Sequence, residues 1–122
     1  QEDVRNLQLA KAAIAAGIEI LLKEKAFGYK DVTGVWLAGG FGSFLNTESA
    51  AKIGLIPKEL LPVTEAVGNA AGEGAVFAAI SKKEREHLLE IQGKMHYLEL
   101  SMHPAFSDLY MDCIPFTSYS GV

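Results

Sequence analysis

The chain has 122 residues, enough for a single domain with a buried core. Its 11 basic and 15 acidic residues give a net charge of −4 without a basic cluster, which argues against a nucleic-acid-binding surface. No apolar run approaches the ~20 residues that span a membrane, and the single cysteine, Cys113, excludes an internal disulfide or a cysteine-ligated cluster and is typical of a reducing, cytoplasmic compartment.

The first predicted element is a long amphipathic helix over residues 2–26. Its large apolar side chains recur at helical spacing on one stripe: Val4, Leu7, Ile14, Ile18 and Leu21. Gly17 costs roughly 1 kcal/mol relative to alanine in mid-helix, which predicts tight packing there. Lys11 lies beside the stripe, and a solvated or snorkelling lysine is favoured over one that faces a ligand.

A short apolar run, Val35 to Ala38, predicts the first strand. It has no polar alternation, which is typical of a strand covered on both faces. Three glycines follow it at Gly39, Gly40 and Gly42. They indicate either backbone angles that other residues avoid or the close approach of backbone to an anion or a purine ring. The spacing is neither G-x-G-x-x-G nor a P-loop, so a tight turn without a ligand stays open.

The same arrangement recurs further along the chain. A short helix follows, for which Asn46 and Thr47 are both candidate caps, and then a turn at residues 57–61. Residues 63–67 predict a second strand. Gly68 and Asn69 then lead into a helix over residues 69–80, whose start is almost bare of side chains around Gly72. Two such strand exits on neighbouring strands would form a cleft at the carboxyl edge of a sheet, where α/β folds bind nucleotides.

The last third of the chain predicts a polar helix over residues 81–92, a strand over Met95–Leu100 and an amphipathic helix from Pro104 to about Cys113. We expect the three strands to form one mixed sheet flanked by helices, with a domain over residues 1–116 and a loosely ordered tail over 117–122. The first methionine is Met95, so we also expect a fragment that lacks an N-terminal partner domain.

The chain offers little reactive chemistry of its own. His87, His96 and His103 lack metal-ligand spacing, and there is no G-x-S-x-G or H-E-x-x-H motif. Cys113 lies among apolar residues, which favours an inert thiol over a nucleophile. We therefore predict no catalytic residue and no metal ligand.

Four segments in this order resemble a known family: AKAAIAAGIEILL, VWLAGGFGSFLNTESAAKIGLIP, VGNAAGEGAVFAAIS and YLELSMHPAF. They are similar to the C-terminal ASKHA-type domain (the actin, Hsp70 and sugar-kinase superfamily) of the reductive activators of corrinoid-dependent enzymes. The resemblance implies that residues 37–42 correspond to the superfamily's adenosine motif and residues 68–74 to the helix start that closes the nucleotide cleft. The adenosine-binding residues would be Gly39, Gly40, Phe41, Gly42, Gly68, Asn69 and Gly72. Phe41 would offer an aromatic face to the base or pack under the loop.

The resemblance also implies a function for the longer protein. Such activators carry an N-terminal [2Fe–2S] ferredoxin domain and use ATP, with Mg²⁺, to drive electron transfer that returns a Co(II) corrinoid protein to Co(I). A corrinoid protein and a second copy of the chain are the implied partners. The ferredoxin cysteines and the early phosphate-binding segment are absent from this sequence. A nucleotide-free regulatory or assembly module, or part of a small-molecule kinase of the same superfamily, stays an alternative.

Overall fold

The computed structural model describes residues 1–116, apart from the side chain of Phe41. Helix α1 (Glu2–Lys25) is the longest element, with acidic residues in its first turn and Ala26 as its left-handed C-cap. Its buried face consists mostly of small residues, among them Ala12, Ala16 and Gly17. A Cβ atom at Gly17 would lie 3.1 Å from Leu100 Cδ1, which confirms the tight packing that this glycine predicted.

Two parallel strands, β1 (Val35–Ala38) and β2 (Thr64–Gly68), form the sheet among the described residues. The chain crosses between them through α2 (Gly39–Phe44), α3 (Thr47–Lys52) and the 3-10 helix η2 (Lys58–Val63). A second 3-10 helix, η1 (Tyr29–Asp31), joins α1 to β1. The predicted α/β class, a small sheet flanked by helices, is confirmed.

The core lies between this crossover and α1. Its buried centre consists of Ala50, Leu55, Ile56 and Leu60, and partly buried side chains from α1 and β1 pack against it, including Ile14, Ile18, Val35 and Leu37. No helix of the described part of the chain is long and apolar enough to cross a membrane.

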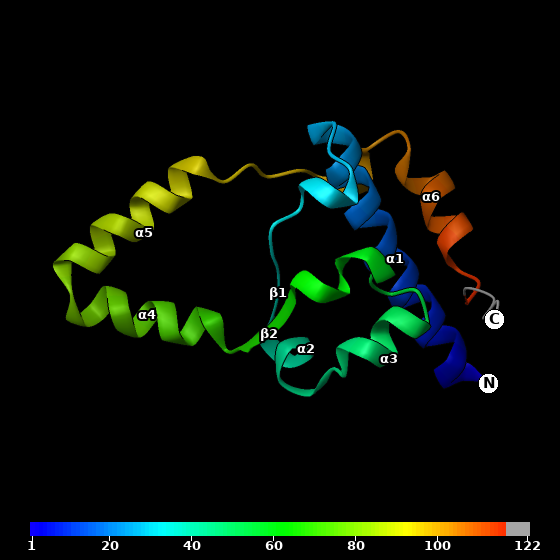
Figure 1. The fold of residues 1–122 in the computed structure, drawn as a ribbon, viewed down its shortest axis with the longest axis horizontal. Helices are drawn as coiled ribbons and strands as arrows, with labels where there is room; N and C mark the ends of the chain where they lie inside the picture. The colour runs from blue at the N-terminus through cyan, green and yellow to red at the C-terminus, as the bar shows by residue number, and fades with distance from the viewer. Residues whose placement is uncertain (117–122) are drawn as a thin grey trace.

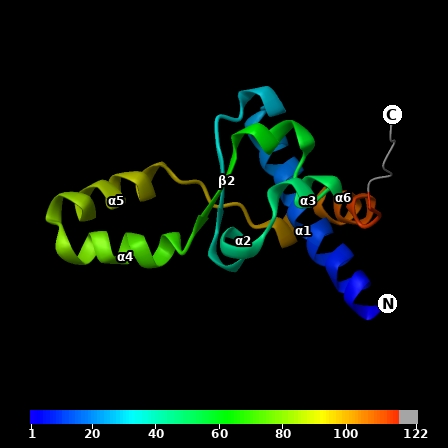
Figure 2. The same ribbon diagram turned by 60° about the horizontal axis from the view of Figure 1, so that its bottom comes forward.

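Helices α4 (Ala70–Ile80) and α5 (Lys82–Lys94) form an arm that projects from the rest of the chain (Figures 1 and 2). Ser81 is the C-cap of α4 and also the N-cap of α5, where its Oγ accepts a hydrogen bond from the Glu84 backbone N–H at 3.2 Å. No residue of either helix is buried.

Two expectations about strands are wrong within residues 1–116. Residues 95–99 return from the arm as an irregular segment before the 3-10 helix η3 (Leu100–Met102), and they do not form the third strand that their alternation predicted. A strand needs a paired neighbour, and no other described strand lies beside this segment. Strand β1 is covered on one face rather than two, since Trp36 is 66% exposed. Because the third predicted strand does not form, the described sheet consists of one parallel pair and is not mixed.

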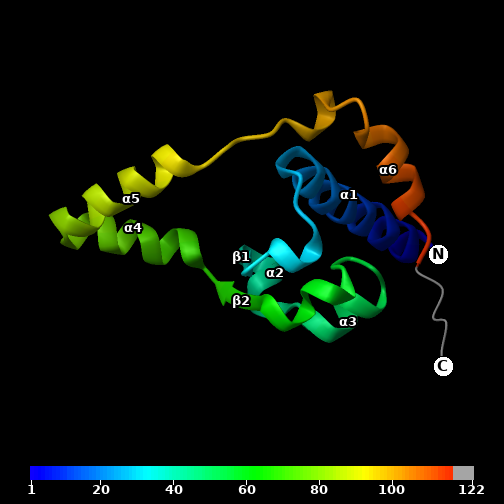
Figure 3. The same cartoon turned by 45° about the horizontal axis from the view of Figure 1, so that its top comes forward.

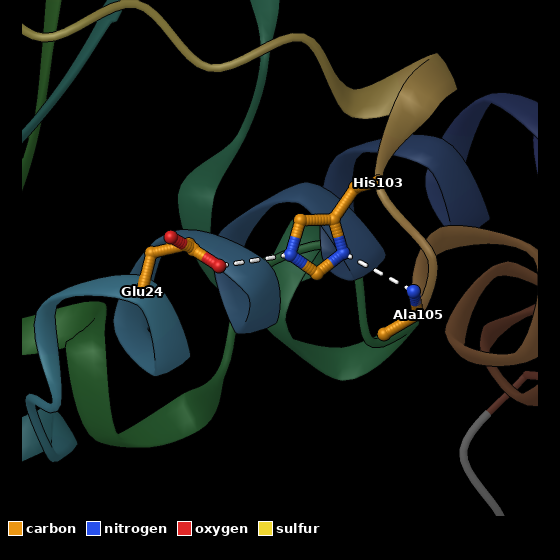
Figure 4. A network of polar contacts seen from close by, with 3 residues as sticks. All are labelled: Glu24, His103 and Ala105. Atoms are coloured by element: carbon orange, nitrogen blue, oxygen red, sulfur yellow. Dashed lines mark hydrogen bonds and ion pairs between the residues drawn. The ribbon is translucent and has the colours of Figure 1, made fainter.

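The last element, α6 (Phe106–Cys113), lies along α1 (Figure 3). His103 joins the two helices, as Figure 4 shows. Its Nδ1 accepts the Ala105 backbone N–H at 3.2 Å, so its Nε2 carries the proton and donates to Glu24 Oε1 at 3.0 Å. The tail expected over 117–122 lies outside the described residues.

Candidate functional site

The two glycine segments meet where the parallel strands end. Ala38, the last residue of β1, is in register with Gly68, the last residue of β2. The chain leaves β1 through Gly39 at a φ of 75° and β2 through Gly68 at a φ of 60°, both in the left-handed region that favours glycine. The helix α2 begins directly at Gly39, so the first glycine cluster lies inside a short helix rather than in a loop before one.

Gly42 is explained by packing inside the chain. A Cβ atom there would lie 2.0 Å from the Leu37 carbonyl oxygen and 3.0 Å from the Gly68 backbone nitrogen. The first turn of α2 therefore folds back over the end of the sheet at a distance that only glycine permits. This contact also places the two predicted segments side by side.

Gly72 and Asn69 form the start of α4. The Asn69 side-chain oxygen accepts a hydrogen bond from the Gly72 backbone N–H at 3.1 Å, which confirms the predicted cap. A Cβ atom at Gly72 would lie 2.3 Å from Asn69 Nδ2, so a side chain at this position would displace the cap.

Gly40 differs from the other glycines of the junction. Its φ is not positive, and a Cβ atom at this position would meet nothing within 4 Å. Backbone strain was one reason to expect a cost at Gly40, and that reason is wrong, because the positive φ belongs to Gly39. Neither conformation nor packing within the described chain requires a glycine at Gly40. The backbone of Phe41 continues α2 directly after it.

A shallow hollow of about 470 Å³ lies beside the second glycine segment. It is lined by Asn69, Gly72, Glu73, Val76 and Phe77. Its lining includes none of residues 39–42, although the backbones of the two segments are in close contact at Gly42 and Gly68. Glu73 is the only charge in the bare segment, residues 68–81.

A second cavity, of about 310 Å³, lies between α1, η1, α3, η2 and α6, and no sequence pattern predicted it. Glu19, Tyr29 and Cys113 line this cavity, and the Tyr29 hydroxyl donates a hydrogen bond to the Glu19 carboxylate. Burial, and then the hydrogen bond to Glu19, raise the pKa of Tyr29 to about 12. Burial also raises the pKa of the Cys113 thiol, although the Lys11 ammonium opposes the shift. Both groups are therefore protonated at neutral pH, and neither is an activated nucleophile or base.

Lys11 is more deeply buried than its sequence position indicated. It is 1% exposed, and its Nζ donates a hydrogen bond to the Pro115 carbonyl oxygen at 2.6 Å. Burial lowers the pKa of its ammonium. The Lys11 side chain thus does not reach solvent, and its ammonium faces Pro115 instead of the two glycine segments. A local sequence pattern does not reveal this partner, because it lies 104 residues away.

The described residues contain no group of three or more His, Cys, Asp or Glu side chains that could hold a metal ion. With one cysteine in the whole chain, there is also no ligand set for a [2Fe–2S] cluster, which takes four cysteines. The junction therefore offers backbone and open space, with the Glu73 carboxylate in the lining of the neighbouring hollow.

A family model described as the "C-terminal domain of RACo the ASKHA domain" matches residues 1–120. The chain belongs to this family. Corrinoid activation enzyme RamQ of Eubacterium limosum is 38% identical over 112 residues, which are 91% of this chain and 19% of RamQ. A solved structure described as a reductive activator for corrinoid, iron–sulfur protein is 37% identical and superposes with a TM-score of 0.85 over 94% of this chain and 18% of its own.

The RACo-type C-terminal domain described here thus spans about a fifth of the length of the relatives that it matches. The name of each of these relatives refers to the activation of a corrinoid or corrinoid protein. Membership also agrees with the order of the four sequence segments on which the resemblance was based.

Proposed function

We propose that this chain is the ATP-binding C-terminal part of a cytoplasmic iron–sulfur protein that uses ATP to reactivate a corrinoid protein from Co(II) to Co(I). Family membership supports the general role, and the names of the relatives support a corrinoid protein as the partner. The chain's own contribution would be one wall of an adenosine site at the ends of β1 and β2.

Gly40 is the observation on which the adenosine site depends. The other four glycines that were predicted to bind adenosine have reasons within the chain, namely left-handed φ at Gly39 and Gly68 and close packing at Gly42 and Gly72. Gly40 has an open side-chain position and an ordinary φ, so a ligand that approaches the backbone there would account for it.

ATP would supply the free energy that drives the low-potential electron transfer. The residues present fit its adenosine part, because Gly40 leaves open space and the Asn69 cap borders a shallow hollow. They do not fit the Mg²⁺-bound phosphates, since the hollow has Glu73 as its one carboxylate and the described residues hold no group of three possible metal ligands. They do not fit the [2Fe–2S] cluster either, since it needs four cysteines and the chain has one. We assign both to polypeptide outside this chain and derive no step through them here.

The adenosine assignment is tested by measuring the binding of ATP to this chain and to its Gly40→Val variant. Saturation-transfer NMR detects the bound ATP. We expect a Kd on the order of 1 mM or weaker for the chain alone and a loss of the signal in Gly40→Val. Gly93→Val is the matched control, since Gly93 lies in α5 and its side-chain position is equally open. Circular dichroism verifies folding. Equal ATP signals in Gly40→Val and Gly93→Val would contradict the site, and no signal in the unsubstituted chain would favour the nucleotide-free module.

We also propose that the chain self-associates. Val4 and Leu7 of α1 and Met111 of α6 are large apolar side chains left exposed on neighbouring helices, and a second copy would cover them. Light scattering over a range of concentrations should show a mass that rises from 13.1 kDa toward twice that value. A constant monomer mass at millimolar concentration would contradict the dimer.

A further inference from the structure

Glu73 is the only charged residue of helix α4. Every other residue of this helix is apolar or glycine, and Glu73 itself is exposed. Among the described residues its carboxylate has no hydrogen-bond or ion-pair partner. Gly72 and Gly74 lie on either side of it, and a Cβ atom at Gly74 would meet nothing within 4 Å. Both oxygens of the Glu73 carboxylate are therefore accessible and free to accept hydrogen bonds.

The hollow that Glu73 lines has an apolar wall next to this carboxylate. Val76 and Phe77 form the wall, and they lie three and four residues after Glu73, on the same face of α4. Val76 is 57% and Phe77 52% exposed, so both side chains are available for contact. The hollow has a volume of about 470 Å³, which lies within the range of roughly 300–1,000 Å³ that is usual for small-molecule sites.

Asn69 supplies hydrogen-bond donors beside the carboxylate. The Gly72 backbone N–H donates to the Asn69 side chain, so the atom that faces this N–H is the amide oxygen. The amide orientation is thereby fixed, and its Nδ2 group remains as a donor beside Gly72, where a Cβ atom would lie 2.3 Å from it. The donors of Asn69 and the acceptors of Glu73 thus lie one helical turn apart in the same hollow.

These groups indicate the chemistry of a ligand. A pair of neighbouring hydroxyls supplies two O–H donors to the two oxygens of a carboxylate, and a carboxylate binds ribose through its hydroxyls in dinucleotide-binding folds. The apolar wall suits the flat ring of a base. A phosphate does not suit the hollow, because the Glu73 carboxylate would repel it and no lining residue is basic. The nucleoside end of a nucleotide therefore fits better than its phosphates.

The hollow also directly follows the two glycine segments. A Cβ atom at Gly42 would lie 3.0 Å from the Gly68 backbone nitrogen, and Asn69 is the next residue of the chain. We infer that Glu73 selects the sugar of the bound nucleotide. Its carboxylate accepts hydrogen bonds from the 2′- and 3′-hydroxyls of ribose, so the site prefers ribonucleotides to 2′-deoxyribonucleotides. This inference rests on the proposed function, because it names the sugar of the nucleotide that is proposed to bind there.

Adenosine and 2′-deoxyadenosine are the probes, since neither carries a phosphate and both can be measured with EDTA present. Titrations followed by saturation-transfer NMR give the Kd of each nucleoside for the 122-residue chain. The unsubstituted chain should bind adenosine about fivefold more tightly or better, because 2′-deoxyadenosine lacks one hydrogen bond to a charged group. Glu73→Ala should bind the two nucleosides equally, with its affinity for adenosine lowered to that for 2′-deoxyadenosine.

Glu84→Ala is the matched control. Glu84 is the acidic residue in the first turn of α5, as Glu73 is in the first turn of α4, but it does not line the hollow. This variant should keep the preference for adenosine, and circular dichroism verifies that each variant is folded. Equal losses in Glu73→Ala and Glu84→Ala would overturn the inference, because both residues would then act only on the helix that they begin.

The remaining outcomes separate the sugar from the site. Equal affinities for the two nucleosides in the unsubstituted chain, with binding lost in Gly40→Val, would overturn the role of Glu73 and leave the adenosine site intact. A preference for adenosine over inosine that Glu73→Ala removes would also overturn it, since the carboxylate would then contact the base.

A second sample covers the case in which the chain alone binds nucleosides too weakly. It is a chimaera in which this chain replaces the matched region of RamQ, and it is titrated with ATP and 2′-deoxy-ATP. The same preference is expected, and its loss is expected in Glu73→Ala. Equal affinities of the chimaera for these two nucleotides would overturn the inference. Absence of binding in both samples would overturn the adenosine site together with the role of Glu73.

Discussion

The ammonium group of Lys11 donates a hydrogen bond of 2.6 Å to the carbonyl oxygen of Pro115, across a sequence separation of 104 residues. The same ammonium lies 5.8 Å from the centroid of the Phe116 ring. Through these contacts one buried side chain of α1 fixes the segment that follows α6. Lys11 is the buried charged residue of the core, and it has a defined partner there.

Truncation of this side chain should therefore loosen α6. We expect Lys11→Ala to lower the free energy of unfolding by about 2–5 kcal/mol, because it leaves a cavity and an unpaired carbonyl. Lys11→Met keeps the apolar stem and relieves the desolvation of the charge, so its loss should be less than half as large. Urea denaturation of the two variants measures the difference. Equal stability of Lys11→Ala and the unsubstituted chain would show that the contact contributes nothing.

Alanine substitutions at two glycines that follow β1, Gly42 and Gly40, should have different effects on the free energy of unfolding. Gly42→Ala should lower the free energy of unfolding by about 3 kcal/mol or more, because its Cβ atom would overlap the Leu37 carbonyl oxygen. Gly40→Ala should change it by no more than about 1 kcal/mol, since the position is open. Thermal unfolding of both variants under one condition makes the comparison. Similar losses in the two variants would contradict the packing described at Gly42.

Tyr29 should make the fold sensitive to alkaline pH. Its pKa of about 12 in the fold lies above the ordinary value of 10.0, so the folded state favours the protonated phenol. Its contribution to stability is complete below pH 10 and is lost as pH rises from 10 toward 12. The difference between the 295 nm absorbance titrations of the unsubstituted chain and Tyr29→Phe should show this late ionisation.

Glu19→Gln is the matched control for Tyr29. It removes the charge that the phenol faces but leaves the burial, so the pKa of Tyr29 should fall and still stay above 10.0. A return to the ordinary value would mean that Glu19, rather than burial, is the main cause of the shift. An ordinary pKa in the unsubstituted chain would contradict the described environment.

Local signals in the sequence predicted much of this fold. Asn69 and Ser81 cap the helices that they were expected to begin, and of the two candidates for α3 it is Asn46, not Thr47, that caps it. Such caps are predictable because a side-chain acceptor two or three residues before a free N–H acts over one turn. The two glycine-rich strand exits were located for a similar reason, since left-handed φ values at Gly39 and Gly68 are a local property. Whether a nucleotide binds between them stays a prediction.

Features that depend on distant residues were not accessible in this way. The alternation of residues 95–100 fits a strand, but a strand forms only beside a partner, and the described chain supplies none. The solvated or snorkelling position predicted for Lys11 is wrong, because local spacing does not reveal its partner Pro115, which lies 104 residues away in the sequence. The cavity at Tyr29 and Cys113 arises where five separate elements converge, which no spacing rule describes.

The shared cap at Ser81 has a consequence for how the arm can vary among related proteins. Because a single residue separates α4 from α5, no loop absorbs a change of length between them. One inserted residue in α4 would rotate everything after it by about 100° around the helix axis and advance it by about 1.5 Å. Helix α5 would then leave in a new direction, and residues 95–99 could not reach Leu100 against Gly17 without rebuilding. We therefore expect homologous arms to keep the number of residues between Asn69 and Ser81, or to change it by whole turns.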